Sequence, residues 1–136
     1  MLAPKKTKHR KWHLQAGTSG SQASRLTKVD FGSFGLKALT ASWVTSRQIE
    51  ATRRVIVRHT RKGGKIWIRL FPDKPVTFHG NEMKMGKGKG APDHFVTVVK
   101  PGAIMFEIDG IPEHKAREAL TSAAHKLPVK CKVVGK

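Results

Sequence analysis

The stretch from Lys84 to Gly90 restricts the possible folds most, because its alternating glycines call for a loop within the surrounding domain. Glycine permits positive φ angles and lets backbone N–H groups approach an anion closely. Each lysine adds a strongly hydrated positive charge on a long side chain. We therefore predict a loop over residues 79–92 that binds a polyanion through Lys84, Met85, Gly86, Lys87, Gly88, Lys89 and Gly90.

The charge of the whole chain points to the same kind of partner. Its 136 residues include 27 Lys and Arg but only 9 Asp and Glu, which gives a formal net charge of +18. Such a charge repels itself in the compact state unless a partner neutralises it, and nucleic acid is the leading candidate. Membrane surfaces also attract basic proteins, but the sequence has no apolar run of about 18 residues that could span a bilayer.

The first 24 residues differ from the rest of the chain. A basic run over residues 5–13 is followed by an uncharged run over residues 15–24 that is rich in Gly, Ser, Thr and Ala. This pattern indicates a basic arm on a flexible tether. A transit peptide is a competing interpretation, because such segments are also basic and poor in acids. In the first interpretation, the arm contacts phosphates through Lys5, Lys6, Lys8, Arg10, Lys11 and His13.

A helix with two different faces is predicted from Thr45 to about Thr60. Thr45 and Gln48 have the spacing of a capping box, and Gly63 with Gly64 is typical of a helix end. One face is apolar and is expected to lie on a sheet. The opposite face is either an ordinary solvated surface or a phosphate-binding surface, and we favour the second for Arg47, Arg54, Arg58 and Arg61, followed by Lys62.

The remaining pattern predicts one α+β domain over residues 25–136. Alternating apolar residues indicate strands over 66–71, 95–99 and 104–108, and Pro72–Pro75 is expected to end the first of them. A second helix is predicted after Pro112, ending at Pro128. Because strands and helices alternate without a regular βαβ repeat, we expect a two-layer sandwich with two main helices packed on a mixed sheet.

The sequence gives little support for an enzyme or for a cofactor-binding protein. Glu107 and Asp109 share one predicted strand face, where carboxylates are usually solvated. The glycine loop lacks the strand and helix that a dinucleotide site needs. The seven histidines are scattered or surrounded by lysine, and Cys131 reads as a small apolar residue of a strand. We predict no catalytic residue, no cofactor and no metal.

Several segments resemble bacterial-type large-subunit ribosomal protein L-sixteen. They cover nearly the whole chain in the same order as in that family. The segments are residues 1–8, 43–51, 66–75, 85–90, 101–102 with 106–107, and 126–128.

The resemblance implies a fold with a hammerhead-like β element and a role as a structural constituent of the large ribosomal subunit. It further implies binding to large-subunit ribosomal RNA, a position near the aminoacyl-tRNA site and the peptidyl transferase centre, and a part in tRNA accommodation and late subunit assembly. The partners would be ribosomal RNA, tRNA at the aminoacyl site with the peptidyl site as a second candidate, and neighbouring ribosomal proteins, without a membrane or a second copy of the chain. A free-standing nucleic-acid-binding protein is the alternative.

Two further expectations follow from the resemblance. The likeness starts at Met1, which disfavours a transit peptide, and we expect a bacterial ribosome in the cytoplasm, with an organellar ribosome as the alternative. The family usually carries arginine, hydroxylated in some bacteria, where this chain has Lys84. Lysine makes a point-charge contact in place of a planar bidentate one, so this modification should be absent here.

Overall fold

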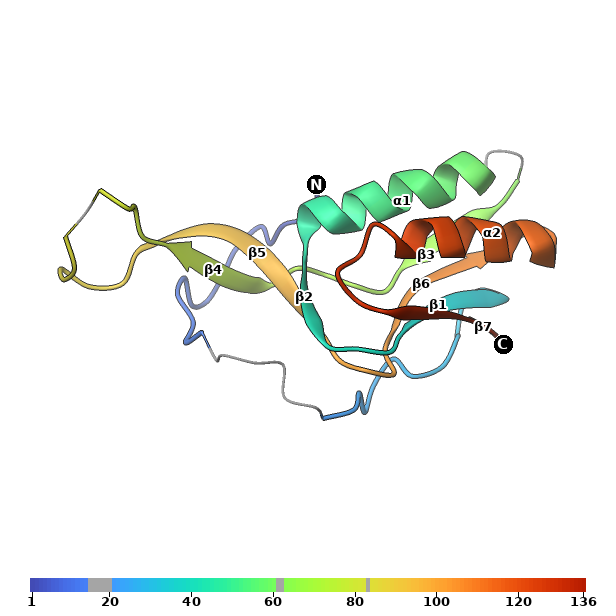
Figure 1. Cartoon of the computed structure of the whole chain (residues 1–136), viewed down its shortest axis with the longest axis horizontal. Helices are drawn as coiled ribbons and strands as arrows, with labels where there is room; N and C mark the ends of the chain where they lie inside the picture. The colour runs from blue at the N-terminus through green and yellow to red at the C-terminus, as the bar shows by residue number, and fades with distance from the viewer. Residues whose placement is uncertain (15–20, 61–62, 83) are drawn as a thin grey trace.

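A computed structural model describes residues 1–14, 21–60, 63–82 and 84–136 of the chain (Figure 1). Its described part contains two helices and seven strands. In chain order they are β1 (Phe34–Ala38), β2 (Ser42–Thr45), α1 (Ser46–Thr60), β3 (Lys65–Ile68), β4 (Lys74–Phe78), β5 (Ala91–Val99), β6 (Ile104–Asp109), α2 (Glu113–Ala124) and β7 (Cys131–Gly135).

Helices α1 and α2 lie side by side over one face of a four-stranded sheet with the order β3-β6-β1-β7 (Figure 1). Every pair of neighbouring strands in it is antiparallel. The core between the layers contains fully buried side chains from both helices and the sheet, including Leu36, Ile49, Ile56, Phe106 and Leu120. Burial of such side chains is the main favourable contribution to folding, so this half provides a rigid base.

The second sheet has the order β2-β5-β4 and forms an extension that leads away from the helices (Figure 1). Strands β4 and β5 pair as a hairpin, and residues 79–90 connect them at its tip. We expected Pro72–Pro75 to end the strand before it, and β3 does end at Ile68. The further expectation that this segment takes no part in a sheet is wrong, because Lys74 begins β4 and Pro75 lies inside it opposite Phe95. Strand β4 is at the edge of its sheet, where the missing N–H of proline costs no ladder hydrogen bond.

The predicted α+β class and the two main helices are confirmed. The capping box forms as expected, since the Thr45 N–H donates to Gln48 Oε1 at 2.9 Å and the Gln48 N–H donates to Thr45 Oγ1 at 3.3 Å. The buried side of α1 contains Ile49, Thr52 and Ile56, as the periodicity predicted. The structure refines the sheet, which is divided into two antiparallel sheets.

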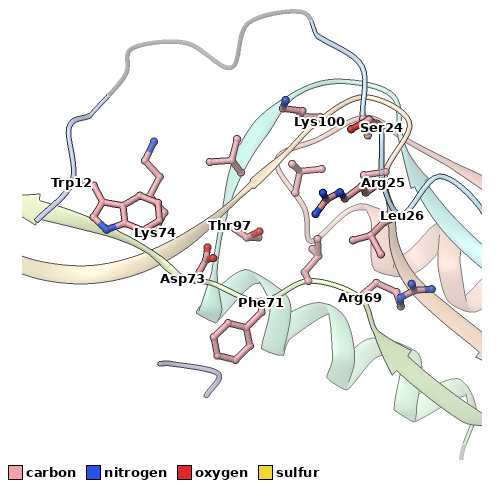
Figure 2. A pocket seen from close by; sticks show the side chains of 15 residues that line it. Trp12, Ser24, Arg25, Leu26, Arg69, Phe71, Asp73, Lys74, Thr97 and Lys100 are labelled. Atoms are coloured by element: carbon pink, nitrogen blue, oxygen red, sulfur yellow. The ribbon is translucent and has the colours of Figure 1, made fainter. Parts of the chain in front are cut away.

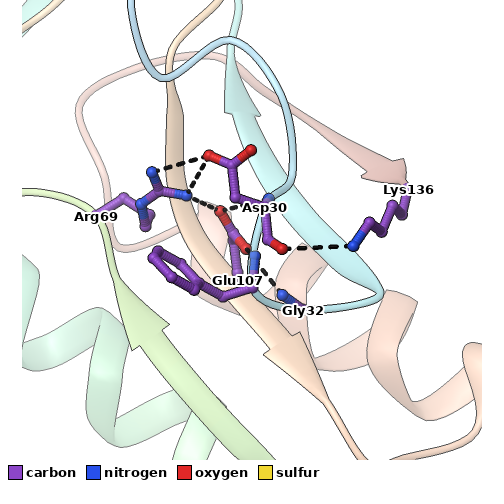
Figure 3. A network of polar contacts seen from close by, with 6 residues as sticks. Asp30, Gly32, Arg69, Glu107 and Lys136 are labelled. Atoms are coloured by element: carbon purple, nitrogen blue, oxygen red, sulfur yellow. Dashed lines mark hydrogen bonds and ion pairs between the residues drawn. The ribbon is translucent and has the colours of Figure 1, made fainter.

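The solvated state predicted for Glu107 is wrong. Its side chain is fully buried, on the face of β6 that the segment over residues 29–33 covers (Figure 3). The carboxylate accepts backbone N–H groups from Phe31 at 2.7 Å and Gly32 at 2.9 Å, and it forms an ion pair with Arg69. A buried charge is stable only when paired and hydrogen-bonded in this way.

These contacts also set the acidity of Glu107. Burial alone would raise its pKa, but the hydrogen bonds from Gly32 and Phe31, followed by the one from Arg69, outweigh burial and hold the pKa below the ordinary value of 4.5. Asp30 adds a second carboxylate, which accepts from both terminal nitrogens of Arg69 at 3.1–3.2 Å (Figure 3). The cluster therefore ties the chain before β1 to strand β6 and to the residue after β3.

Candidate nucleic-acid interface

The basic arm lies against the hairpin, and its cations face solvent. All six predicted phosphate contacts of the arm are exposed: Lys5, Lys6, Lys8, Arg10, Lys11 and His13. Two reciprocal hydrogen bonds join the arm to the loop. Lys11 Nζ donates to the Lys89 carbonyl at 2.8 Å, and Lys89 Nζ donates to the Trp12 carbonyl. The structure thus brings together two of the three basic regions that the sequence singled out.

The Gly-Lys loop, residues 84–90, has the backbone that its glycines predicted. Gly86 has a φ of 117° and Gly88 a φ of 89°, values that glycine adopts without steric cost, and Lys87 between them has a φ of 59°. A side chain on Gly90 would collide with the Phe78 carbonyl, so this glycine lets the hairpin close behind the loop. Met85 is 96% exposed, and Lys84, Lys87 and Lys89 are exposed as well.

Part of the positive charge on the arginine face of α1 is neutralised by a carboxylate of the same helix. Arg47, Arg54 and Arg58 are exposed. Glu50 accepts from Arg53 Nη2 at 2.7 Å and from Arg54 Nε at 3.1 Å. These side-chain hydrogen bonds, first from Arg53 and then from Arg54, lower the pKa of Glu50 to about 2, so the carboxylate stays charged and offsets part of Arg54. Arg61 and Lys62, also predicted to bind phosphate, lie outside the described residues.

The two ends of this face have different surroundings. Arg47 lies at the start of α1 and lines a hollow together with Asp93 and His94 of β5, so it borders the hairpin. Arg58, near the end of α1, lines a separate hollow with Ile111 and Lys115 beside α2. Of the predicted arginines that the structure describes, Arg47 therefore borders the hairpin and Arg58 lies apart from the arm and the loop.

Few of the cations are neutralised within the chain. Six ion pairs occur in the described ranges, and their cationic partners are Arg53, Arg54, Arg69, Arg117 and His94. No lysine of the described residues takes part in any of them. Because the arm and the Gly-Lys loop depend on lysine for most of their charge, both keep a positive surface that an external polyanion can neutralise.

Sequence reasoning missed a group of side chains that line a hollow between the arm and the second sheet (Figure 2). Its cations are Arg25, Lys74 and Lys100, together with Arg69, which is paired with Asp30 and Glu107, and its aromatic residues are Trp12 and Phe71. These residues come from distant parts of the sequence, so no local motif could reveal them. The one available signal was Trp12, the lone Trp, Tyr or Phe of the arm.

Neither a metal centre nor a reactive thiol is visible where the chain is described. No group of three or more His, Cys, Asp or Glu side chains gathers there in a way that could hold a metal ion. Burial raises the pKa of Cys131 to about 11, so this half-buried thiol stays protonated at neutral pH. Among the same residues, no helix has the length and apolar character needed to cross a bilayer.

Fold and surface together define a basic protein that binds nucleic acid, with a rigid α+β base and a charged extension. Residues 4–134 match the family described as Ribosomal protein L16p/L10e, and the chain belongs to this family. It is 55% identical over 132 residues to the large ribosomal subunit protein uL16c of Cyanidium caldarium, covering 97% of this chain and 93% of that protein. The uL16c protein of Thalassiosira pseudonana is 54% identical over 134 residues, which cover 98% of this chain and 96% of that protein.

Family membership confirms the resemblance seen in the sequence. The chain is a structural constituent of the large ribosomal subunit and not an enzyme, with ribosomal RNA and other ribosomal proteins as partners. The expected bacterial ribosome in the cytoplasm is wrong. Both relatives are algal proteins named uL16c, the chloroplast form, and they point to an organellar ribosome.

Proposed function

We propose that the chain binds large-subunit ribosomal RNA through the arm and the start of the arginine face, and that the Gly-Lys loop lies beside tRNA. The observation that carries this proposal is the distribution of unpaired charge. Among the candidate residues that the structure describes, ion pairs engage Arg54 alone. Exposed cations without acidic partners release counterions when they meet phosphate, which is the main source of non-specific affinity for RNA.

The hairpin gives the Gly-Lys loop its proposed role beside tRNA. The loop lies at the tip of the β4–β5 extension, away from the helices that cover the core (Figure 1). With the arm bound to its base through Lys11 and Lys89, the loop is positioned to reach a second RNA while the arm contacts the first. In this proposal the loop approaches tRNA near the aminoacyl site and the peptidyl transferase centre and helps tRNA accommodation, and the protein joins the subunit late in assembly.

The separation between the arm and the folded part of the chain supports the proposed domain organisation. Residues 1–24 act as the basic arm and tether, and residues 25–136 form one globular domain that contains the loop over residues 79–92. Within the described part of the tether, the Ala23 N–H donates a backbone hydrogen bond to the Pro101 carbonyl of the domain at 2.9 Å. In the described structure the connection between β4 and β5 covers residues 79–90, and Pro92 belongs to β5.

Binding of the full chain to large-subunit ribosomal RNA at increasing KCl concentration tests the proposal. If about eight phosphates are neutralised, the log–log slope of affinity against salt is about −6 to −7. Replacing Arg47 and Lys11 with glutamine should make the slope shallower by about 2, because each lost phosphate contact removes about one unit. Affinity that does not depend on salt would contradict the proposed mode of binding.

A charge-matched control separates the proposed surface from net charge alone. Lys115 and Lys126 are exposed in and after α2 and lie outside the proposed interface. Replacing both with glutamine also removes two positive charges, yet the slope should stay within about half a unit of that of the unaltered chain, because no phosphate contact is lost. Equal effects of the two double substitutions would show that the charge acts without a defined surface.

A further inference from the structure

A hollow with a volume of about 510 Å³ separates the arm from the second sheet (Figure 2). Its wall is formed by Trp12 of the arm, the segment 23–26, the residues between β3 and β4, and strand β5. None of these residues is among the cations of the interface proposed above. The size and the mixed lining raise the question of which part of an RNA could enter.

The floor of the hollow is apolar, and aromatic rings stand beside it. Leu70 and Val99 on the floor are nearly buried, with 7% and 1% of their surface exposed. Trp12 and Phe71 remain 40% and 47% exposed. An unpaired nucleobase has two apolar faces, and stacking on an aromatic side chain is the usual way in which proteins hold one.

The cations lie at the edges of the hollow. Lys74 is held with its ammonium group 4.5 Å from the centre of the Trp43 ring, which fixes a positive charge next to Trp12. Lys100 lies at the opposite side, and the guanidinium of Arg25 points toward the middle of the hollow (Figure 2). A nucleotide whose base enters the hollow would thus find a cation for its phosphate on either side.

The polar groups inside the hollow suit a base better than a phosphate. Asp73 and the nearly buried Thr97 lie close to its centre, between Trp12 and Arg25 (Figure 2). A carboxylate repels phosphate but accepts hydrogen bonds from the amino and imino groups of a base edge. Four cations line the hollow, and Arg25, Lys74 and Lys100 remain after Arg69 has paired with Asp30 and Glu107. Three such cations against one acid favour a nucleic acid over a peptide, whose backbone carries no charge.

We infer that this hollow binds one unpaired nucleotide of the RNA, with the base inserted beside Trp12 and Phe71 and the phosphate outside at Lys74 or Lys100. This inference rests on the proposed binding to ribosomal RNA and specifies a site within it. Stacking and hydrogen bonding hold the base, so the contribution of this site depends on single-stranded structure rather than on charge.

Binding of the full chain to two RNA probes, measured by fluorescence anisotropy at one salt concentration, tests this site. One probe is a single strand of about ten adenylates, a length within the range that single-strand binding sites cover. The other is a blunt RNA duplex without unpaired bases. Trp12→Ala should weaken binding to the single strand about 5- to 100-fold, as expected for the loss of one stacking partner, and change duplex binding less than about twofold.

Three further substitutions make the outcome specific. Trp12→Phe keeps a stacking ring and should restore most of the affinity, and Leu14→Ala removes a neighbouring apolar side chain that does not line the hollow and should have no effect. Asp73→Ala removes a negative charge, so it should strengthen a purely electrostatic contact. If Asp73 accepts a hydrogen bond from the base, this substitution instead weakens binding to the single strand.

The possible failures can be told apart. Normal binding of the single strand by the Trp12→Ala variant, or equal weakening on both probes, would overturn the nucleotide site while salt-dependent binding to ribosomal RNA upheld the proposed function. Tighter binding of the single strand by the Asp73→Ala variant would overturn it too. Failure of the unaltered chain to bind ribosomal RNA would refute the proposed function and this inference with it.

Discussion

Beside strand β6 of the four-stranded sheet, charge is enclosed and paired, whereas in the Gly-Lys loop at the tip of the β4–β5 hairpin it is exposed and has no acidic partner. Glu107 is fully buried and is satisfied by Arg69 and three backbone N–H groups. The lysines of the Gly-Lys loop have solvent around them, and Lys89 bonds to a backbone carbonyl of the arm in place of a carboxylate. One region uses charge to fix the fold, and the other presents it to a partner.

This difference shows how a chain with a net charge of +18 limits the cost of its own repulsion. The scarce acids are placed where they stabilise structure: Glu107 and Asp30 hold the chain before β1, and Glu50 pairs with two arginines on α1. The lysines collect where the backbone is extended or looped, so their mutual repulsion falls on segments that contribute little to the core. Substitutions in the two regions should therefore affect different properties.

The largest effect on stability is expected from Glu107→Gln. The substitution leaves Arg69 buried with only Asp30 as its acidic partner and removes one of the oxygens that accept backbone N–H groups. Breaking a buried ion pair from one side costs about 3–5 kcal/mol of unfolding free energy, which is a large part of the stability of a small domain. Urea denaturation followed by circular dichroism measures this loss.

Glu50→Gln is the matched control, since it removes the same charge from a surface ion pair. Exposed pairs in a helix contribute little because water and salt screen them. Its loss of stability should be a small fraction of that caused by Glu107→Gln. Similar losses for both variants would show that burial does not distinguish the two regions and would break the comparison.

A change of pH is expected to alter the unfolding free energy less than Glu107→Gln does. Because the pKa of Glu107 lies below 4.5 in the folded chain, the unfolded state binds more protons as the pH falls past that value. The stability that ionised Glu107 provides is fully present above the unfolded pKa and is lost as pH falls through the lower folded value. The difference in unfolding free energy between the unaltered chain and Glu107→Gln should therefore narrow below about pH 4.5.

Glu50 is present in both chains and cancels from this difference, so salt is needed to distinguish the two carboxylates only when the pH dependence of the unaltered chain is measured alone. Glu50, whose pKa is lowered to about 2, acts in the same direction over the same range of pH, but it lies at the surface. At about 1 M KCl the screening length falls to about 3 Å, so the contribution of Glu50 fades while the buried pair is screened much less. If the pH dependence of the unfolding free energy disappears in high salt, the surface ion pairs cause it.

Much of the fold could be predicted from the sequence. The capping box at Thr45 and Gln48 and the apolar periodicity of α1 are local signals, and both helices begin where expected, although α2 ends at Ala124, before the predicted end at Pro128. Strand β4 was missed because proline was taken as a break, although an edge position tolerates it. The burial of Glu107 was missed because alternation along β6 cannot reveal that the segment before β1 folds over its second face.

The candidate site could be predicted only in part. The Gly-Lys loop and the arm were visible because their residues are contiguous and their chemistry follows from composition. The contact of Lys11 with the Lys89 carbonyl joins residues 78 positions apart, and no local pattern encodes it. The hollow between Trp12 and Arg25 depends on the same long-range approach, which is why only the structure showed it.

The smallest effect on stability is expected from the double substitution Lys87→Ala and Lys89→Ala. Both side chains are exposed, and the hydrogen bonds of Lys89 to the arm are solvated, so the unfolding free energy should change by less than about 0.5 kcal/mol. If the loop approaches tRNA as proposed, ribosomes that carry this variant should accommodate aminoacyl-tRNA more slowly, measured by rapid-mixing fluorescence.

Lys115→Ala with Lys126→Ala removes the same charge outside the interface and should leave the rate unchanged. An unchanged rate in the loop variant would sink the proposed role of the hairpin, and a large loss of stability would show that the loop belongs to the fold after all.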